Sequence, residues 1–451
     1  MTAQSAAEAL RQAFATGSYH QLADHYAEQA LFDASLVGGR YCVRGPGAIA
    51  AALAREWGGP AELVEWTARV HPAGFELWAE RVGTAGASRT RQYVWVEDGR
   101  IARHWIYSAP PRTPPRGQSS DARVRLDTQL LAGLGEVVEH ESMISRGWSG
   151  NAVERLVLAD GRKLVAKRIA PGSNWMDHHT ADEGREALLF KSGVMARLPW
   201  AIDHTILAAE RDGDAWWVVM KDVSHLLLPD QKRLSRDESV SILAAANGMW
   251  EEFWGEEVPH LCSLPDFFRL FSPTIAEAER AGLDLLPKQY EVFWEAFAEA
   301  VDSDVAEGVL NVQRDPGPFI TKLEALGTTL IHADIRDEHL GFAANRVILL
   351  DWGRATQGHP VLDFAWSMCH NGSRTDATND ELVDDFRRVR GDHDDPRANE
   401  LIGLAGLLMY GWVFGHSATY HPDPAEREWA RKELAWWVPQ TRRGLEAIGV
   451  A

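Results

Sequence analysis

Cysteine is scarce in this chain. The 451 residues include three cysteines, Cys42, Cys262 and Cys369, and no two of them form a CxxC pair. Neither a disulfide framework nor a cysteine-based zinc site can therefore be built. We expect a protein of the reducing cytoplasm.

Basic residues and long apolar runs are also in short supply. The chain has 46 Lys and Arg against 65 Asp and Glu, a formal net charge of -19. Such a surface repels phosphate backbones and anionic lipid. The N-terminal stretch has no basic segment ahead of an apolar one, and we find no uninterrupted apolar run of about 18 residues. These absences predict a soluble protein that has neither nucleic acid nor a membrane as a partner.

What the chain does have is enough length for two or three domains of about 100 to 200 residues each. Prolines crowd the segment 109–121, where they fix φ and remove backbone donors, so we expect a linker there. Residues 6–30 show helical apolar spacing, and residues 62–108 alternate between polar and apolar. The first domain, residues 1–108, should therefore combine helices with a curved antiparallel sheet.

The last hairpin of this sheet can be placed in register on its Asp98-Gly99 turn. With these two residues at the turn, Tyr93 pairs with His104 and Trp95 with Ala102. Tyr93, Trp95, His104 and Ile106 then share one face of the sheet. That face could line a pocket, or it could be a packed face with one hydrogen-bonded histidine.

The order of these elements resembles the SnoaL-like branch of the nuclear-transport-factor-2-like (NTF2-like) superfamily. The resemblance covers residues 3–108, with Asp33 before a strand and the run VEDGRIARHW at the end. It implies an α+β cone around a pocket, used for cyclase or isomerase chemistry, for ligand binding, or for dimerisation alone. Asp33 and His104 are the acid-base candidates, and a homodimer through this domain is a further expectation.

After the linker, residues 137–170 read as three strands joined by glycine-containing turns. Gly147, Ser149 and Gly150 offer backbone amides and a hydroxyl, groups that bind phosphate oxygens. Lys167 alternates with apolar residues in the third strand and needs a counter-charge, either phosphates or a carboxylate. Glu186, in the first turns of the next helix, is the expected carboxylate.

The richest cluster of polar residues comes late in the chain. His332, Asp334 and His339 follow the apolar pair Leu330-Ile331, and Asp351 directly follows the apolar strand Val347–Leu350. Two carboxylates at neighbouring strand ends suit phosphoryl transfer, in which one accepts a hydroxyl proton and the other holds Mg²⁺.

These motifs resemble the aminoglycoside phosphotransferase and choline kinase-like family, which has a protein-kinase-like fold. The resemblance covers residues 122–445 and implies a catalytic base at Asp334, a loop-bracing residue at His332 and a Mg²⁺ ligand at Asp351. It also implies that Lys167 binds the α- and β-phosphates of ATP, with Glu186 as its helix partner.

The same resemblance divides the domain into an N-lobe, residues 122–225, and a helical C-lobe, residues 226–451. It places an adenine-binding hinge from Met220 to Val223 and a structural aspartate at Asp363. One position departs from the family pattern: His339 occupies the place of the asparagine that binds Mg²⁺. Mg²⁺ prefers oxygen ligands, although an imidazole can bind a metal and Glu338 beside it could supply an oxygen.

The sequence thus predicts an α+β protein in which an NTF2-like cone is joined to a bilobal kinase-like domain. The expected enzyme is a small-molecule kinase that moves the γ-phosphoryl group of ATP, with Mg²⁺, to a hydroxyl of a sugar, aminosugar, amino alcohol or antibiotic-like metabolite. Because of His339, one alternative is a pseudokinase or ligand-binding regulator. A second alternative is cyclase or isomerase chemistry in the cone.

Overall fold

The computed structural model describes residues 2–36, 39–83, 86–110, 133–143, 152–229 and 232–450. The chain forms two compact units, and each is assembled from three stretches. Unit 1 comprises Met1–Gly117, Pro273–Ala300 and Trp412–Leu434, and unit 2 comprises Gln118–Ser272, Val301–Gly411 and Ala435–Ala451. Most of the expected linker at 109–121 lies outside the described residues, so the boundaries expected at 108 and 122 stay predictions.

A six-stranded sheet forms the centre of unit 1. Its strand order is β2-β1-β6-β5-β4-β3, and all neighbours are antiparallel except the parallel pair β1 and β6. The strands span β1 Tyr26–Leu36, β2 Gly39–Arg44, β3 Ala61–His71, β4 Gly74–Gly83, β5 Gly86–Glu97 and β6 Arg100–Ala109. The alternating segments at 62–108 are therefore confirmed as strands.

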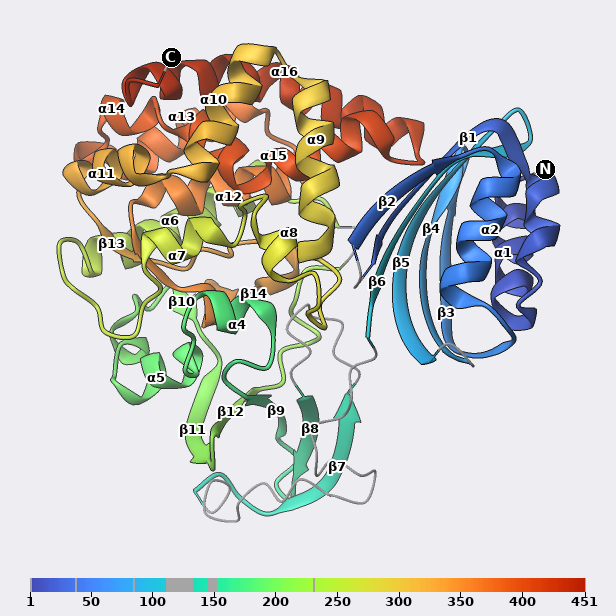
Figure 1. Ribbon diagram of the computed structural model, residues 1–451. Helices are drawn as coiled ribbons and strands as arrows, with labels where there is room; N and C mark the ends of the chain where they lie inside the picture. The colour runs from blue at the N-terminus through green and yellow to red at the C-terminus, as the bar shows by residue number, and fades with distance from the viewer. Residues whose placement is uncertain are drawn as a thin grey trace. The chain divides into compact units, whose positions relative to one another are not determined.

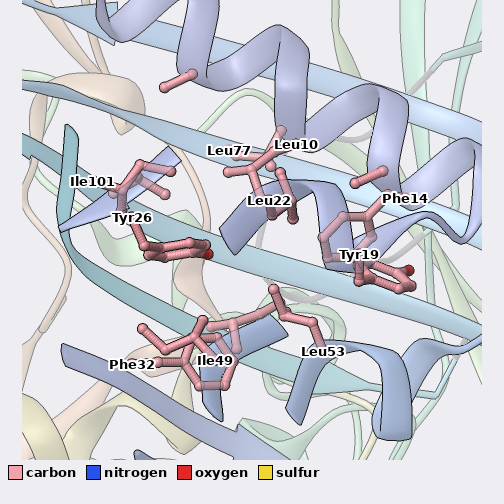
Figure 2. Close-up of a cluster of buried hydrophobic side chains, with 14 of the residues drawn as sticks. Leu10, Phe14, Tyr19, Leu22, Tyr26, Phe32, Ile49, Leu53, Leu77 and Ile101 are labelled. Atoms are coloured by element: carbon pink, nitrogen blue, oxygen red, sulfur yellow. The ribbon is translucent and has the colours of Figure 1, made fainter. Parts of the chain in front are cut away.

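Two helices and a 3-10 turn lie along one face of this sheet (Figure 1). They are α1 Ala3–Thr16, η1 Tyr19–His25 and α2 Pro46–Trp57. A capping box between Thr2 and Ser5 begins α1, and Gly17, in the left-handed region at φ 74°, ends it. Between helices and sheet lies a packed apolar core that includes Phe14, Leu53 and other large side chains (Figure 2). The space between the helices and the sheet is filled by side chains.

The β5–β6 hairpin differs from the predicted register. Its turn is at Asp98-Gly99 as expected, and Glu97 pairs with Arg100. A bulge between Trp95 and Val96 then shifts the rest, so that Tyr93 faces Trp105 rather than His104. Because side chains alternate with a period of two, this one-residue shift moves His104 and Ile106 to the opposite face from Tyr93 and Trp95. The predicted shared face is wrong.

His104 is a structural residue of the buried core. It is completely buried, with its Nδ1 2.6 Å from the Tyr26 hydroxyl and its Nε2 2.9 Å from Gln92 Oε1. Burial lowers the pKa of His104 to about 3. Asp33 pairs with Trp105 on the neighbouring strand, one position away from the Phe32–His104 pair, so Asp33 and His104 point to opposite faces. The two acid-base candidates cannot act on one bound molecule.

The second face of the sheet contacts other stretches of unit 1. Tyr93 lies against Phe293 and His416, and Trp105 meets Tyr420 edge to face, with ring centroids 4.2 Å apart. Short segments around this face are α8 Ile275–Ala278, η3 Pro287–Gln289 and α9 Tyr290–Ala300. Asp33 accepts hydrogen bonds from Arg40 on this side, at 2.8 and 3.1 Å.

A five-stranded antiparallel sheet forms one half of unit 2. Its order is β11-β12-β9-β8-β7. The strands are β7 Val137–Met143, β8 Ala152–Leu158, β9 Lys163–Ile169, β11 Ile206–Asp212 and β12 Ala215–Lys221, with α4 Trp175–His179, α5 Arg185–Lys191 and η2 Met195–Arg197 inserted between β9 and β11. The three strands expected within residues 137–170 are confirmed.

The other half of unit 2 is helical and holds short strands that present loops. Its helices are α6 Arg236–Glu252, α7 Leu264–Arg269, α10 Ser303–Arg314, α11 Gly317–Leu326, α12 Pro360–Asn371, α13 Asn379–Arg390 and α14 Pro396–Asn399, with η6 Gly372–Arg374 and η7 Gly391–His393. A three-stranded sheet has the order β10 Ile202–Asp203, β15 Arg346–Leu349 and β14 Leu340–Ala343. A two-stranded sheet consists of β13 Thr329–Ile331 and β16 Thr356–Gly358. The 3-10 turns η4 Asp337–His339 and η5 Trp352–Arg354 follow β13 and β15.

Two long helices near the C-terminus contribute to both units. They are α15 Ile402–Tyr420 and α16 Pro424–Ala447. The stretch Pro396–Tyr420 is long and apolar enough to cross a membrane, with a mean hydropathy of 1.4 in its most apolar window. Since 89% of that window is buried inside the protein, it has the burial of a core helix.

Candidate phosphoryl-transfer site

Three distant segments of unit 2 meet at the Lys167 ammonium group. Lys167 Nζ lies 3.0 Å from Glu186 Oε2 in the first turn of α5 and 2.9 Å from Asp351 Oδ1 at the end of β15. The Glu186 side chain is 2% exposed and that of Asp351 is 41% exposed. The lysine is therefore anchored on the buried side and meets an accessible carboxylate on the other.

The opposite charges of this cluster keep Lys167 protonated and Asp351 ionised. Burial acts to lower the pKa of Lys167, but the carboxylates of Asp351 and Glu186 outweigh it and raise that pKa. Burial likewise acts to raise the pKa of Asp351, and Lys167 outweighs it, so the carboxyl titrates below its usual range. At neutral pH the site contains an ammonium group and an ionised carboxylate in contact.

The loop that follows β13 is held by a buried aspartate. Asp363 is completely buried, and its carboxylate accepts hydrogen bonds from the backbone N–H groups of His332 and Ala333 and from Trp250 Nε1, at 2.6 to 3.0 Å. Burial raises the pKa of Asp363 to about 6. Ala333 has a φ of 62°, a conformation that L-residues rarely adopt, so these bonds hold a strained turn next to Asp334.

His332 connects the same loop to the strand that ends at Asp351. Its Nδ1 accepts the backbone N–H of Asp334 at 3.2 Å, so Nε2 carries the proton and donates to the Leu350 carbonyl at 3.1 Å. Burial lowers the pKa of His332 to about 3, which keeps this arrangement neutral. The contacts are those of a residue that braces the loop.

Asp334 is surrounded by cations and one indole. Its Oδ1 accepts from Trp366 Nε1 at 2.9 Å and from Arg354 Nη1 at 3.1 Å, and Arg336 Nε lies 3.4 Å away. The Arg354 guanidinium stacks over the Trp366 ring, 4.2 Å from its centroid. Burial acts to raise the pKa of Asp334, but Arg354, Arg336 and His339 outweigh it and hold that pKa well below its usual range.

The consequence for chemistry is that Asp334 is an ionised but weakly basic carboxylate. Two strong donors occupy Oδ1, which fixes the plane of the group. Oδ2 has His339 Nδ1 3.4 Å away. Because the transition state of phosphoryl transfer is loose, the reaction depends mainly on the position of the attacking hydroxyl. A correctly oriented carboxylate of low basicity can therefore act as the proton acceptor.

His339 lies between the two carboxylates that the sequence singles out. Its Nδ1 is 3.1 Å from the Asp334 carbonyl oxygen, and its Nε2 is 3.2 Å from Arg336 Nη2 and 3.9 Å from Asp351 Oδ2. Glu338, the other suggested oxygen ligand, forms an ion pair with Arg336, and its side chain is 64% exposed. A divalent cation held by Asp351 would therefore have His339 Nε2 as a neighbour. The residues present could supply one oxygen ligand, from Asp351, and one nitrogen ligand, from His339.

The remaining predicted ligand-binding residues fall in two groups. Gly147, Ser149 and Gly150 lie outside the described residues, so the phosphate-binding turn stays a prediction. Met220 is at the end of β12, and the buried Val223 follows it on the way to α6. Lys167 pairs with Val218 on β12, so the expected hinge continues the strand next to the lysine.

A further buried cluster, which was not predicted from the sequence, anchors α5. Arg185 is 3% exposed and donates to the carbonyls of Thr180, His260 and Gly353, while its Nη1 lies 3.4 Å from Asp182 Oδ2. Asp182 Oδ1 also caps α5 by accepting the N–H groups of Gly184 and Arg185. Arg185 thus ties the helix that carries Glu186 to the segment after Asp351.

Sequence reasoning also missed Arg336, Arg354 and Trp366. Weak signals were present: Arg336 follows Asp334 by two residues and Arg354 follows Asp351 by three. Trp366 is three residues after Asp363, so both project from the same face of α12. None of these spacings separates a site residue from a solvent-facing one.

Comparison with known proteins gives the family. Residues 143–401, more than half of the chain, match the sequence model of the phosphotransferase enzyme family. The chain belongs to this family, which makes it a small-molecule phosphotransferase by class. No curated protein matches the chain.

Solved structures show looser similarity. An aminoglycoside phosphotransferase from Alicyclobacillus acidocaldarius is 15% identical, with a TM-score of 0.40 over 75% of this chain and 98% of that one. The choline kinase LicA from Streptococcus pneumoniae is 12% identical, with a TM-score of 0.40 over 72% and 98%. A microcompartment-associated aminopropanol kinase is 15% identical, with a TM-score of 0.43 over 72% and 98%. Superpositions this loose assign no role to any residue.

Proposed function

We propose that this chain transfers the γ-phosphoryl group of ATP to a hydroxyl of a small metabolite, such as a sugar, aminosugar, amino alcohol or antibiotic-like compound. The observation that carries the proposal is the contact of Lys167 with Asp351, together with the position of His339 between Asp351 and Asp334. Membership of the phosphotransferase family supports it.

Each residue has a role that its surroundings allow. Lys167, held by Glu186, would bind the phosphates of the nucleotide. Asp334 would orient the acceptor hydroxyl through Oδ2 and accept its proton, while Trp366 and Arg354 hold Oδ1. Asp351 and His339 would hold Mg²⁺, which bridges the phosphates and neutralises their charge when bound.

The test begins with nucleotide binding and ends with turnover. In a thermal-shift measurement, ATP with Mg²⁺ should raise the melting temperature of both the wild type and Asp334→Asn. ATP turnover against a panel of acceptors should then fall by about 10² to 10⁴-fold in Asp334→Asn, because the acceptor hydroxyl loses its ionised partner. Asp392→Asn, on an exposed 3-10 turn, serves as the matched control and should keep wild-type turnover. Failure to bind nucleotide would overturn the proposal.

One observation favours a second candidate, a regulator that binds nucleotide without efficient transfer. His339 stands where the family carries an oxygen ligand, and Arg354 and Trp366 engage the carboxylate of Asp334. Nucleotide binding with no turnover on any acceptor, in the wild type as in Asp334→Asn, would select this candidate.

We also propose a cellular location and a role for the N-terminal domain. Scarce cysteine supports a cytoplasmic location. The six-stranded sheet with helices on one face is compatible with an NTF2-like domain and with a homodimer formed through it. Cyclase or isomerase chemistry there loses its proposed acid-base pair, because Asp33 and His104 lie on opposite faces of the sheet.

A further inference from the structure

The orientation of the His339 ring determines which of its nitrogens can bind a metal. A carbonyl oxygen only accepts hydrogen bonds, so the 3.1 Å contact with the Asp334 carbonyl requires a proton on Nδ1. In the neutral ring the lone pair is then on Nε2. Donation of the other ring N–H to a backbone carbonyl is one of the ways in which proteins orient a metal-binding imidazole.

Nε2 faces Oδ2 of Asp351. The two atoms are 3.9 Å apart. Two neighbouring ligands of an octahedral ion, each about 2.1 Å from it, lie about 3.0 Å apart, so these two atoms must approach by about 0.9 Å for a single ion to bind both. Lys167 holds the other oxygen, Oδ1, at 2.9 Å, which orients Oδ2 toward the histidine.

Arg336 must move before a cation can bind His339 Nε2. Its Nη2 donates to His339 Nε2 at 3.2 Å. The same guanidinium already pairs with Glu338 and lies 3.4 Å from Asp334, so it keeps carboxylate partners when it leaves the imidazole. Replacement of this hydrogen bond by a cation therefore leaves no buried charge without a partner.

We propose that His339 Nε2 and Asp351 Oδ2 form a mixed nitrogen and oxygen site that selects a divalent first-row transition ion, such as Mn²⁺, over Mg²⁺. The inference rests on the proposed function, because the ion would enter with the nucleotide. Mg²⁺ favours an all-oxygen shell, whereas affinity for imidazole rises along the transition series. An oxygen ligand in place of His339 removes the preference.

The test reads out metal coordination directly. Mn²⁺ is added to the full-length protein with ADP, and pulsed electron paramagnetic resonance is recorded on protein labelled with ¹⁵N at histidine. We expect a ¹⁵N coupling to the bound Mn²⁺. Competition should show Mn²⁺ preferred over Mg²⁺ by about tenfold more in the wild type than in His339→Asn. His393→Asn, exposed on η7, is the control and should keep the coupling.

The outcomes separate this inference from the proposed function. Bound Mn²⁺ and ADP without ¹⁵N coupling, or an unchanged Mn²⁺ to Mg²⁺ preference in His339→Asn, would overturn the selection of a transition ion and leave nucleotide binding intact. If ADP and ATP fail to bind at all, as thermal shift would show, both proposals fall. The wild-type coupling decides the question even if His339→Asn does not fold.

Discussion

The two carboxylate oxygens of Asp334 have different surroundings. Oδ1 accepts from an indole and a guanidinium, and Oδ2 faces the ring of His339. A carboxylate whose plane is fixed in this way presents one defined oxygen to an acceptor. Trp366 should therefore act as a positioning residue for the transfer reaction.

Replacing Trp366 by phenylalanine tests this role. Trp366→Phe keeps a ring under Arg354 but removes the N–H that donates to Asp334 Oδ1 at 2.9 Å. A hydrogen bond to a charged group contributes about 1.5 to 3 kcal/mol, so we expect kcat to fall about 10 to 100-fold. Nucleotide affinity should stay unchanged, because the indole is not in contact with Lys167 or Asp351.

The control for this variant is Trp200→Phe. Trp200 is 70% exposed, and its replacement should change neither kcat nor nucleotide affinity. A Trp366→Phe enzyme with wild-type kcat, or one in which nucleotide affinity falls as much as kcat, would contradict the positioning role.

At the scale of elements, helix α5 connects the five-stranded sheet of unit 2 to the candidate site, because its Glu186 pairs with Lys167 on β9. The helix has seven residues, and a helix this short has little stability of its own. Asp182 caps its start, and Arg185 bonds it to the carbonyls of Gly353 and His260. The position of Glu186, and with it that of Lys167, therefore depends on these contacts.

Arg185→Met should loosen α5. The variant removes the donor to the carbonyls of Thr180, His260 and Gly353 and leaves the buried Asp182 without its guanidinium, and breaking a buried pair costs about 3 to 5 kcal/mol. We expect a loss of stability of this order in urea unfolding, together with weaker ATP binding by titration calorimetry. Arg269→Met, which removes an ion pair from a side chain that is 53% exposed, should change stability by less than about 0.5 kcal/mol. Equal effects of the two variants would refute the anchoring role.

Local patterns predicted the elements and the positions of charged residues within them. Alternation in β9 placed Lys167 on the face of Val165, opposite Leu164 and Ala166, and the apolar run of β15 marked Asp351 at its end. The strand pattern also identified β5 and β6 but not the bulge between Trp95 and Val96, and the register was wrong for that reason. A bulge adds one residue without changing composition, so periodicity carries no sign of it.

At the scale of the whole molecule, buried neutral histidines should make stability depend on pH. Burial lowers the pKa of His104 and His332 to about 3 and that of His359 to about 4. In the unfolded chain histidine titrates near 6.5. As pH falls from about 6.5 towards 3, the unfolded state binds more protons than the folded state, so folding stability is lost.

Each such histidine should lower the free energy of unfolding by about 1.4 kcal/mol per pH unit in this window. Asp363 and Asp177, whose pKa values burial raises to about 6 and about 7, act in the opposite direction. Urea unfolding between pH 7.5 and 4.5 should show a net loss of stability towards low pH. In His104→Gln the slope of unfolding free energy against pH should be smaller by the contribution of one histidine, about 1.4 kcal/mol per pH unit. The exposed His393→Gln should leave this slope unchanged. A slope that is the same in all three proteins would contradict the assignment.

The sequence by itself determined the strands, the two carboxylates that follow strands and the lysine within a strand, because hydrophobic periodicity and turn residues act within a few positions of the chain. Tertiary structure alone decided that Arg354 and Trp366 share an oxygen of Asp334, and that His104 and Asp33 lie on opposite faces of their sheet. It also decided that 273–300 and 412–434 join the N-terminal sheet in one unit. These contacts depend on the packing of side chains from distant segments, and no local pattern records which distant surface will fit.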